Sequence, residues 1–287
     1  MNTDCSFYIG TTHEICQDYA LTNNNSIVIS DGCSGSIKSD IGARILSITT
    51  MNKMKELENL YNFEGKECIL LARPSIQILN LPYECLDATI LSAIIYDDSI
   101  QTMCYGDGVI AIKIKNKDII IINCSYIDSY PFYINYFYDK TGRYKNWINN
   151  NNKRKICLST IKKDESIDPL EKELNLEINL RIGIGEDEIG ILKHFDNKTI
   201  IEIADKNIIE FIAIMSDGVH SFYETIITET SKYNKSISYL DVLKELLSFK
   251  NYNKLFVQRR INKFRKDCAK KNWANADDLS LAVIYMG

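Results

Sequence analysis

The sequence lacks any run of the roughly 20 apolar residues that a helix needs to span a bilayer. Its first ten residues also lack the charged head and apolar core of a secretion signal. We therefore expect no membrane segment and a cytoplasmic location.

No C-x-x-C pair occurs, although the chain has nine cysteines, an odd total. This pattern indicates reduced thiols rather than a disulfide framework, and it makes a zinc site unlikely. Because free cysteine packs as a small hydrophobe, most of these side chains are expected to be buried.

The sequence has no excess of basic residues either, because its 34 Lys and Arg are outnumbered by 38 Asp and Glu, which gives a net charge of -4. The charge therefore gives no reason to expect nucleic acid or an anionic membrane as a partner. With 45% hydrophobic and 25% charged residues, the composition is that of an ordinary globular protein. A length of 287 residues fits one large domain or two small ones.

The first predicted elements are a strand and a helix. The short β-branched run 26–30 is stopped by Asp31-Gly32, which is typical of a buried strand that ends in a turn. A helix is predicted from Asp40 to near Leu57, where one apolar face would comprise Ile41, Ile45, Ile48, Met51 and Met54.

Between residues 87 and 124 the sequence shows three strand-like stretches followed by the isoleucine run 119–122. Short connectors such as Asp97-Asp98 predict an antiparallel meander and disfavour a parallel nucleotide-binding sheet. The Asn-rich segment 146–153 and its charged flank to Pro169 are predicted to be a surface insertion. Further strands are predicted at 208–215 and 279–286, and helices at 238–249 and 253–270.

Three acidic positions at predicted strand ends carry the chemistry. Two strands end in Ser30-Asp31-Gly32 and Ser216-Asp217-Gly218, and Asp277-Asp278 stands before the last strand. A single Asp-Gly pair is more often a turn. Together, carboxylates on rigid strand ends suit Mg or Mn, and the glycines would let the backbone approach a ligand. Two such ions activate a water for attack on a phosphoryl group.

Six segments in order give the sequence a resemblance to a known family. They are GTTHEICQD (10–18), VISDGCSGS (28–36), LDATI (86–90), CYGDG (104–108), IAIMSDGV (212–219) and ADDLSLAVI (276–284). This series resembles the 2C-type, or PPM, family of metal-dependent serine/threonine phosphatases in its bacterial, single-domain form. The resemblance implies an α+β fold, a four-layer sandwich of two antiparallel sheets flanked by helices. It also implies one domain over 1–287 with a variable insertion around 127–200.

The resemblance also implies a role for each matched residue. Asp31 would bridge two Mn or Mg ions, the Gly32 carbonyl would bind one of them, and Asp217 and Asp277 would bind the other. Asp18 would hold metal-bound waters, so Asp18 and Asp31 are the catalytic candidates. Asp107 matches a third, weaker ion site, but a hairpin turn explains it equally well. Asp278 takes the usually amidic position after the ligand, so replacement of Asp278 by asparagine should be tolerated.

Three positions depart from the family pattern. Gln17 stands where a glutamate is frequent, His13 where an arginine commonly grips substrate phosphate, and Cys33 where many members have histidine. His13 could donate to phosphate as an imidazolium, although a structural role is equally plausible. Cys33 is expected to pack.

The predicted function is hydrolysis of phosphoserine or phosphothreonine in proteins by a water that bridges the two ions, with a serine/threonine kinase as the opposing enzyme. One alternative is a catalytically weak or silent phosphoprotein-binding domain of the same fold, suggested by His13, Gln17 and Cys33. Another is a two-metal nuclease or small-molecule phosphatase, and the acidic balance weakens the nuclease option.

Overall fold

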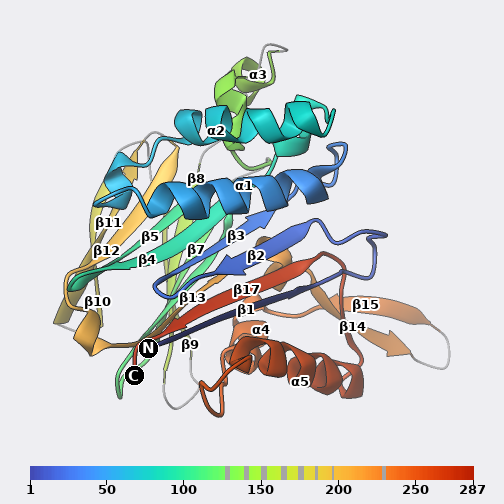
Figure 1. Cartoon of the computed structure of the whole chain (residues 1–287). Coiled ribbons are helices and arrows are strands. Elements are labelled where there is room, and N and C mark those ends of the chain that lie inside the picture. The colour runs from blue at the N-terminus through green and yellow to red at the C-terminus, as the bar shows by residue number, and fades with distance from the viewer. Residues whose placement is uncertain are drawn as a thin grey trace.

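The computed structural model of the chain describes residues 1–126, 130–138, 142–149, 154–162, 167–173, 178–184, 187–195, 197–227 and 231–287. In this part of the chain, two seven-stranded sheets pack face to face, and all their pairings are antiparallel. Helices cover the outer faces of the two sheets, so four layers are visible in Figure 1.

One sheet contains both ends of the chain. Its strands, in spatial order, are β1 (Asn2–Tyr8), β17 (Leu279–Tyr285), β13 (Ile209–Met215), β6 (Gly108–Ile114), β7 (Ile119–Tyr126), β8 (Arg154–Ile161) and β9 (Ile167–Glu173). Asn2 is the partner of Tyr285 and Tyr8 is the partner of Leu279, so the two termini lie side by side (Figure 1). The acidic pair before Leu279 therefore lies at the opposite end of this sheet.

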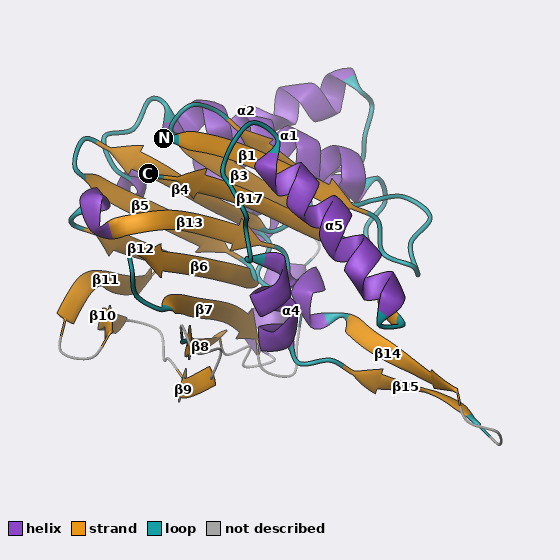
Figure 2. Ribbon diagram, turned by 90° about the horizontal axis from the view of Figure 1, so that it is seen from below, coloured by secondary structure: helices purple, strands orange, loops and turns teal. Residues whose placement is uncertain are grey.

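The second sheet carries the first Asp-Gly turn. Its strands, in spatial order, are β10 (Ile178–Ile184), β11 (Asp187–Phe195), β12 (Lys198–Ile203), β5 (Ser99–Tyr105), β4 (Ile90–Tyr96), β3 (Ser26–Asp31) and β2 (Asp18–Thr22). A small third sheet, which the sequence did not predict, has the order β15 (Lys232–Ser236), β14 (Phe222–Ile227), β16 (Trp273–Asn275). Its β14–β15 hairpin projects from the body of the molecule (Figure 2).

The helices form the outer layers. On the second sheet lie α1 (Ser39–Met54) and α2 (Gly65–Ile78), with α3 (Arg143–Asn149) beyond them, and under the first sheet lie α4 (Tyr239–Leu246) and α5 (Phe256–Lys270) (Figure 1). The predicted helices at 40–57, 238–249 and 253–270 are thus confirmed with shorter bounds. The sequence did not predict α2.

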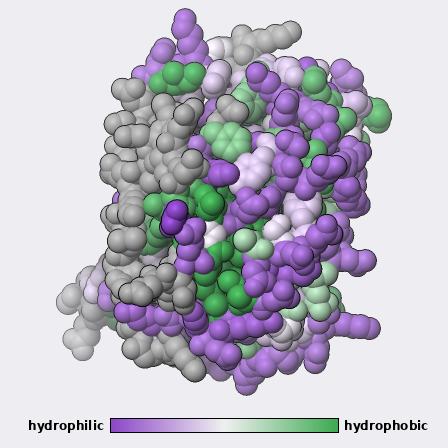
Figure 3. Space-filling view, turned by 90° about the vertical axis from the view of Figure 1, so that its left-hand side faces the viewer, coloured by the Kyte–Doolittle hydropathy of each residue, from purple (hydrophilic) through white to green (hydrophobic). Residues whose placement is uncertain are grey.

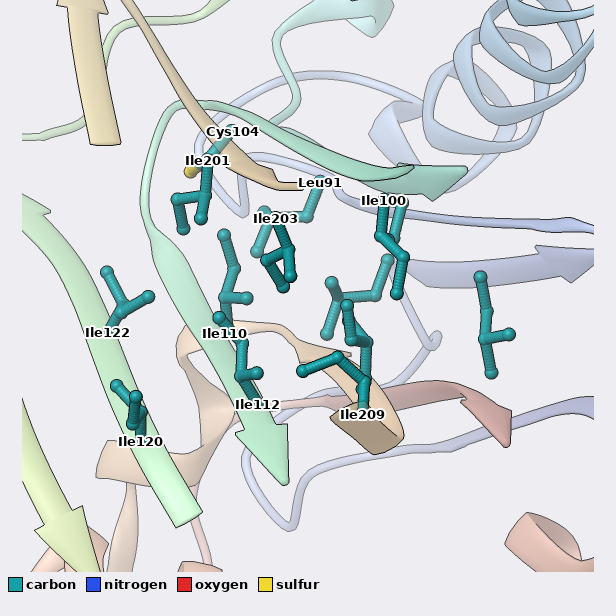
Figure 4. Packing of buried hydrophobic residues seen from close by; sticks show 14 of the residues in the cluster. Leu91, Ile100, Cys104, Ile110, Ile112, Ile120, Ile122, Ile201, Ile203 and Ile209 are labelled. Atoms are coloured by element: carbon teal, nitrogen blue, oxygen red, sulfur yellow. The ribbon is translucent and has the colours of Figure 1, made fainter. Parts of the chain in front are cut away.

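Both faces of each sheet are buried, and the strand sequences show why. In β6, Ile110 and Ile112 belong to the core between the sheets, while Val109 and Ala111 belong to the core under the α4–α5 layer. Because successive side chains point to opposite faces, such a strand needs apolar residues at every position. Figure 4 shows the inter-sheet core, where isoleucines from facing strands meet. Each fully buried isoleucine there contributes about 1.5–3 kcal/mol.

The predicted meander is wrong at one point. Strands β4 and β5 form a hairpin, and β6 and β7 form another, but the two hairpins lie in different sheets. The chain crosses between the sheets through Gly106-Asp107-Gly108. Asp107 therefore does not lie in a hairpin turn, and the crossover brings its carboxylate between the two sheets.

The predicted apolar face of α1 is right for Met51 and Met54, which are buried in the core, but wrong at Ile48. Ile48 is 48% exposed, whereas Gly42, Ala43, Leu46 and Ser47 are buried. Small and weakly polar side chains face the sheet because α1 packs closely on β2 and β3. Periodicity in hydrophobicity alone could not find a face made of such residues.

The predicted surface insertion is wrong for part of its length. Residues 154–161 form β8, which pairs with β7 and places Ile156 and Leu158 in the inter-sheet core. Trp147 on α3 is buried as well, among the aromatic rings of Tyr126 and Phe132. Residues 150–153 and 163–166 lie outside the described part, and variation of 127–200 among relatives stays a prediction.

The surface and the thiols agree with the sequence expectations. On the face shown in Figure 3, the described side chains are mainly polar, with apolar ones gathered toward the middle. All nine cysteines are free thiols, and six of them are buried. Within the described residues, no helix is long and apolar enough to cross a membrane.

Candidate functional site

The first Asp-Gly turn is fixed by a buried strand. The carbonyl of Asp31 accepts a 2.8 Å hydrogen bond from the backbone N–H of Thr89, whose hydroxyl lies 3.1 Å from the Asp31 nitrogen. Ser30 is anchored to the same residue, because its hydroxyl donates to the Thr89 carbonyl at 2.6 Å. These bonds explain why the LDATI segment accompanies the turn.

The second turn and the terminal acidic pair meet at the end of neighbouring strands. Asp217 follows β13, Asp277 and Asp278 precede β17, and these strands are paired. The backbone N–H of Ser216 donates to the carbonyl of Ser280 at 3.2 Å, which joins the two segments beyond the ladder.

The glycines of both turns allow two backbone segments to pack closely. A Cβ atom on Gly218 would lie 1.7 Å from the carbonyl oxygen of Asp278, and one on Gly32 would lie 2.7 Å from that of Ser39. No side chain fits at such distances. Glycine is therefore required here because two backbones approach closely, and close approach of a ligand to the backbone stays a prediction.

Four aspartates from four separate segments line one cavity of about 130 Å³. Asp31 comes from the end of β3, Asp107 from the crossover, Asp217 from the start of the short η5 helix (Asp217–His220), and Asp277 from the segment before β17. The remaining lining residues are His13, Gly32, Cys33, Ser34, Thr89, Pro131 and Tyr133. The fold thus brings together every residue proposed from sequence except Asp18.

Asp18 lies beside the cavity without lining it. It is the cross-strand partner of Asp31 and is 1% exposed. Its Oδ2 accepts a 2.7 Å hydrogen bond from the hydroxyl of Ser216, while its Oδ1 is buried without a partner. Burial, together with the charges of Asp278 and Asp217, raises the pKa of Asp18 to about 7.

The carboxylates in the cavity disfavour one another's charge. Burial, then the charges of Asp18 and Asp217, raise the pKa of Asp31 well above its ordinary value. The pKa of Asp107 is raised in the same way by burial and by Asp217, and that of Asp277 is raised by the same two causes. Asp31 and Asp217 are close enough for their carboxyl groups to share a proton.

This arrangement fits a divalent cation. The donor set is oxygen, and the Oδ1 atom of Asp217 is buried without a hydrogen-bond partner, as is that of Asp18. Buried carboxylates with orphan oxygens need a positive partner, and Mg or Mn supplies one. Among the described residues, no three acidic, imidazole or thiol groups are arranged as ligands of one ion. A bound ion would therefore take many of its ligands from water, as Mg usually does.

His13 faces the terminal acidic pair. Its Nδ1 lies 3.0 Å from Oδ2 of Asp278, and its Nε2 lies 3.5 Å from Oδ1 of Asp277. Burial lowers the pKa of His13, but the hydrogen bond to Asp278 and the charges of Asp278, Asp277 and Asp18 outweigh burial and raise it. The imidazolium is thus favoured, and it lines the cavity at the position where the sequence comparison expects a phosphate-binding cation.

Asp278 is a structural anchor. Its carboxylate accepts hydrogen bonds from the backbone N–H of Gly10 at 2.8 Å and of Gln17 at 2.6 Å, in addition to the contact with His13. The side chain is 1% exposed, against 40% for Asp277. With donors on both oxygens, this geometry argues against the expectation that asparagine is tolerated at position 278, because an amide NH2 would face a backbone N–H.

Gln17 and Cys33 are used in packing around the first turn. The side-chain amide of Gln17 donates to the hydroxyl of Ser39 at 2.6 Å and to the carbonyl of Cys33 at 3.3 Å. Cys33 lines the cavity and is hydrogen-bonded to the side chain of Tyr133. Burial and the neighbouring Cys33 raise the pKa of the Tyr133 phenol, so the phenol keeps its proton.

A buried carboxylate that sequence reasoning missed holds one wall of the cavity. Asp87 accepts hydrogen bonds from the hydroxyl of Ser36 at 2.8 Å and the side-chain amide of Asn135 at 2.9 Å, and it forms an ion pair with Arg143. Its own carbonyl accepts from the Cys33 N–H at 2.8 Å. Asp87 therefore links the first turn to the segment that carries Pro131 and Tyr133. The LDATI segment, which contains Asp87, matched the family pattern, but the match did not show which residues Asp87 would bind.

Comparison with known proteins agrees with this geometry. The family model described as Protein phosphatase 2C matches residues 10–264. A bacterial serine phosphatase of known structure is similar, with a TM-score of 0.52 at 10% identity, over 100% of this chain and 98% of that one. The serine/threonine phosphatase Stp1 from Staphylococcus aureus gives 0.50 at 10% identity, over 99% and 94%. No significant match was found among curated protein sequences.

Proposed function

The chain belongs to the protein phosphatase 2C family and is a protein serine/threonine phosphatase, and we propose that its acidic cavity binds two Mn or Mg ions for hydrolysis of phosphoserine and phosphothreonine. The observation that carries the proposal is the convergence of Asp31, Asp217 and Asp277 on one cavity, with the Asp217 Oδ1 atom left without a partner. The family is metal-dependent, which agrees with this donor set.

The proposed ligands are those that the family resemblance implies, and all of them line the cavity. Asp31, in contact with Asp217, is the carboxylate we assign to both ions, and Gly32 would offer its carbonyl to one of them. Asp217 and Asp277 would bind the other ion, and Asp107 would serve a third, weaker site. When bound, such ions lower the pKa of a water molecule and neutralise charge on the phosphoryl group.

The protein's own residues supply position and charge. The backbone N–H and the hydroxyl of Thr89 hold Asp31, and the contact between Gly218 and Asp278 holds Asp217 beside Asp277. Asp18, the buried cross-strand partner of Asp31, would hold the waters bound to the ions. This is the catalytic role that we propose for Asp18.

His13 is proposed as the residue that contacts substrate phosphate. Its ring lines the cavity with Nδ1 held 3.0 Å from the Asp278 carboxylate, and Nε2, which lies 3.5 Å from Asp277, is the nitrogen that would turn to a phosphate oxygen. A charged imidazole donates a strong hydrogen bond to a phosphate oxygen, although a guanidinium would donate two. The substrate would be a phosphorylated protein, and a serine/threonine kinase would supply that phosphate.

The test is hydrolysis of p-nitrophenyl phosphate and of a phosphothreonine peptide with Mn, with Mg, and with EDTA. We expect turnover with either ion and none with EDTA. The Asp217→Asn variant should lose most of this activity. Asp98→Asn is the matched control, because Asp98 is 91% exposed on a remote hairpin, and it should keep full activity.

Two results would overturn the proposal. Turnover in EDTA would exclude the metal-dependent mechanism. Absence of turnover at saturating Mn, with tight binding of the phosphopeptide, would instead identify a phosphoprotein-binding domain.

A further inference from the structure

Two buried thiols from opposite sheets meet beside the crossover. Cys104 lies at the end of β5 in one sheet, and Cys124 lies on β7 in the other. Both belong to the inter-sheet core, where Figure 4 shows the Cys104 sulfur among the isoleucines. Gly108, four positions after Cys104, is the cross-strand partner of Cys124, so the crossover brings the thiols together. They are hydrogen-bonded to each other.

A buried arginine lies against this pair. Arg154 on β8 is 5% exposed, and its guanidinium donates to the Cys104 sulfur at 3.0 Å and to the Gly106 carbonyl at 2.7 Å. Its other bonds go to the carbonyls of Asn197 and Cys104, at 3.1 and 3.3 Å, and to the sulfur of Cys124. Among the residues that the structure describes, these partners are carbonyl oxygens and sulfurs rather than carboxylates.

A guanidinium buried in this way needs a negative partner. The hydrogen bond from Cys104, then the charge and hydrogen bond of Arg154, outweigh burial and lower the pKa of Cys124 to about 6. Burial and Cys124 raise the pKa of Cys104, so Cys104 keeps its proton, with its sulfur 3.3 Å from the Gly106 carbonyl.

We propose that Cys104 and Cys124 form a redox-active dithiol, activated by Arg154, which hydrogen peroxide oxidises to a disulfide that joins the two sheets. The thiolate of Cys124 attacks peroxide and breaks its O–O bond, giving a sulfenic acid and one water after protonation. The thiol of Cys104 then attacks the sulfenic sulfur, its proton leaves with the hydroxyl as a second water, and the S–S bond forms. Two thiols and one peroxide thus give one disulfide and two waters.

Oxidation would also affect the acidic cavity. The disulfide removes the thiolate that balances Arg154, and Arg154 holds the Gly106 carbonyl beside Asp107. We expect weaker binding of the metal that Asp107 contacts and lower phosphatase activity, reversed by dithiothreitol. This second effect depends on the proposed function, whereas formation of the disulfide does not.

The experiment treats the folded protein with hydrogen peroxide, blocks free thiols, and maps disulfides by mass spectrometry of a non-reducing digest. A linked Cys104–Cys124 peptide is expected in the wild type and in the Cys68→Ser control. Cys68 is an equally buried thiol that is hydrogen-bonded to Thr50 and has a pKa raised to about 12. Arg154→Met should slow the linkage at least about tenfold, because the thiolate loses its cation.

Two results would overturn the proposal. One is a wild-type protein in which Cys68 is oxidised while Cys104 and Cys124 stay unlinked. The other is an Arg154→Met variant, folded by circular dichroism, that forms the disulfide at the wild-type rate. The wild-type digest needs neither a variant nor phosphatase activity, so its result stands apart from the metal assay.

Discussion

Replacement of Asp278 by asparagine tests whether Asp278 anchors the structure while Asp277 binds the metal. The Asp278 carboxylate accepts from the N–H groups of Gly10 and Gln17 and contacts His13, and it is almost fully buried. The asparagine amide would turn one acceptor into a donor against a buried N–H. Loss of one charge-assisted hydrogen bond costs about 1.5–3 kcal/mol, and an unsatisfied buried donor costs about 1–3 kcal/mol. We expect a loss of about 2–4 kcal/mol, or about 4–12 °C in melting temperature.

The matched variant Asp277→Asn should behave in the opposite way. Asp277 is 40% exposed, and burial and Asp217 raise its pKa, so neutralising it removes repulsion. Without metal its melting temperature should equal or exceed that of the wild type, while activity with Mn falls roughly 10–100-fold or more. Thermal unfolding in EDTA and turnover with Mn measure both quantities. A stable, inactive Asp278→Asn beside an unstable, active Asp277→Asn would refute this assignment.

Three further predictions follow from the charges in the cavity. Asp217→Asn should lose most activity with Mn and melt no lower than the wild type in EDTA, and near-normal turnover would remove Asp217 from the metal site. His13→Ala should raise KM for a phosphopeptide, and His13→Arg should lower it with little change in kcat. If KM is unchanged in both variants, His13 does not contact the phosphate and its role is structural. The folded pKa of Asp18, about 7, exceeds its unfolded value near 3.9. The contribution of protonated Asp18 to the free energy of unfolding is therefore fully present below pH 4 and is lost as the pH rises to 7. Metal-free protein should therefore melt lower at pH 7.5 than at pH 5, and saturating Mn should remove the difference, which thermal scans at both pH values measure.

Much of the fold was accessible from local sequence patterns. Strands such as β3 and β13 are continuous apolar runs that end at an Asp-Gly pair, and α4 and α5 have amphipathic spacing. Local sequence patterns did not predict the buried residues in segments whose hydrophobic residues do not follow a regular spacing. The buried face of α1 mixes small and hydroxyl side chains with Leu46, Met51 and Met54, and β8 follows an Asn-rich segment that masks its role in the core.

The sequence also predicted only part of the candidate site. The Asp-Gly pairs and the family resemblance identified Asp31, Asp217 and Asp277 as candidates, since these residues stand at ends of strands. The partner of a buried polar group is set by contacts between distant segments, so Asp87 and Arg143 could not be paired from sequence. The anchoring role of Asp278 was hidden for the same reason, because its donors come from residues 10–17.

The sequence by itself determined which segments become strands and where their acidic ends lie, because apolar runs and Asp-Gly turns act over a few residues. Only the tertiary structure decided that the chain changes sheets at Asp107, that Asp278 is an anchor beside Asp277, and that Arg154 meets two thiols from opposite sheets. These outcomes depend on which strands pair and on which charges are buried together, and both are properties of the whole folded chain.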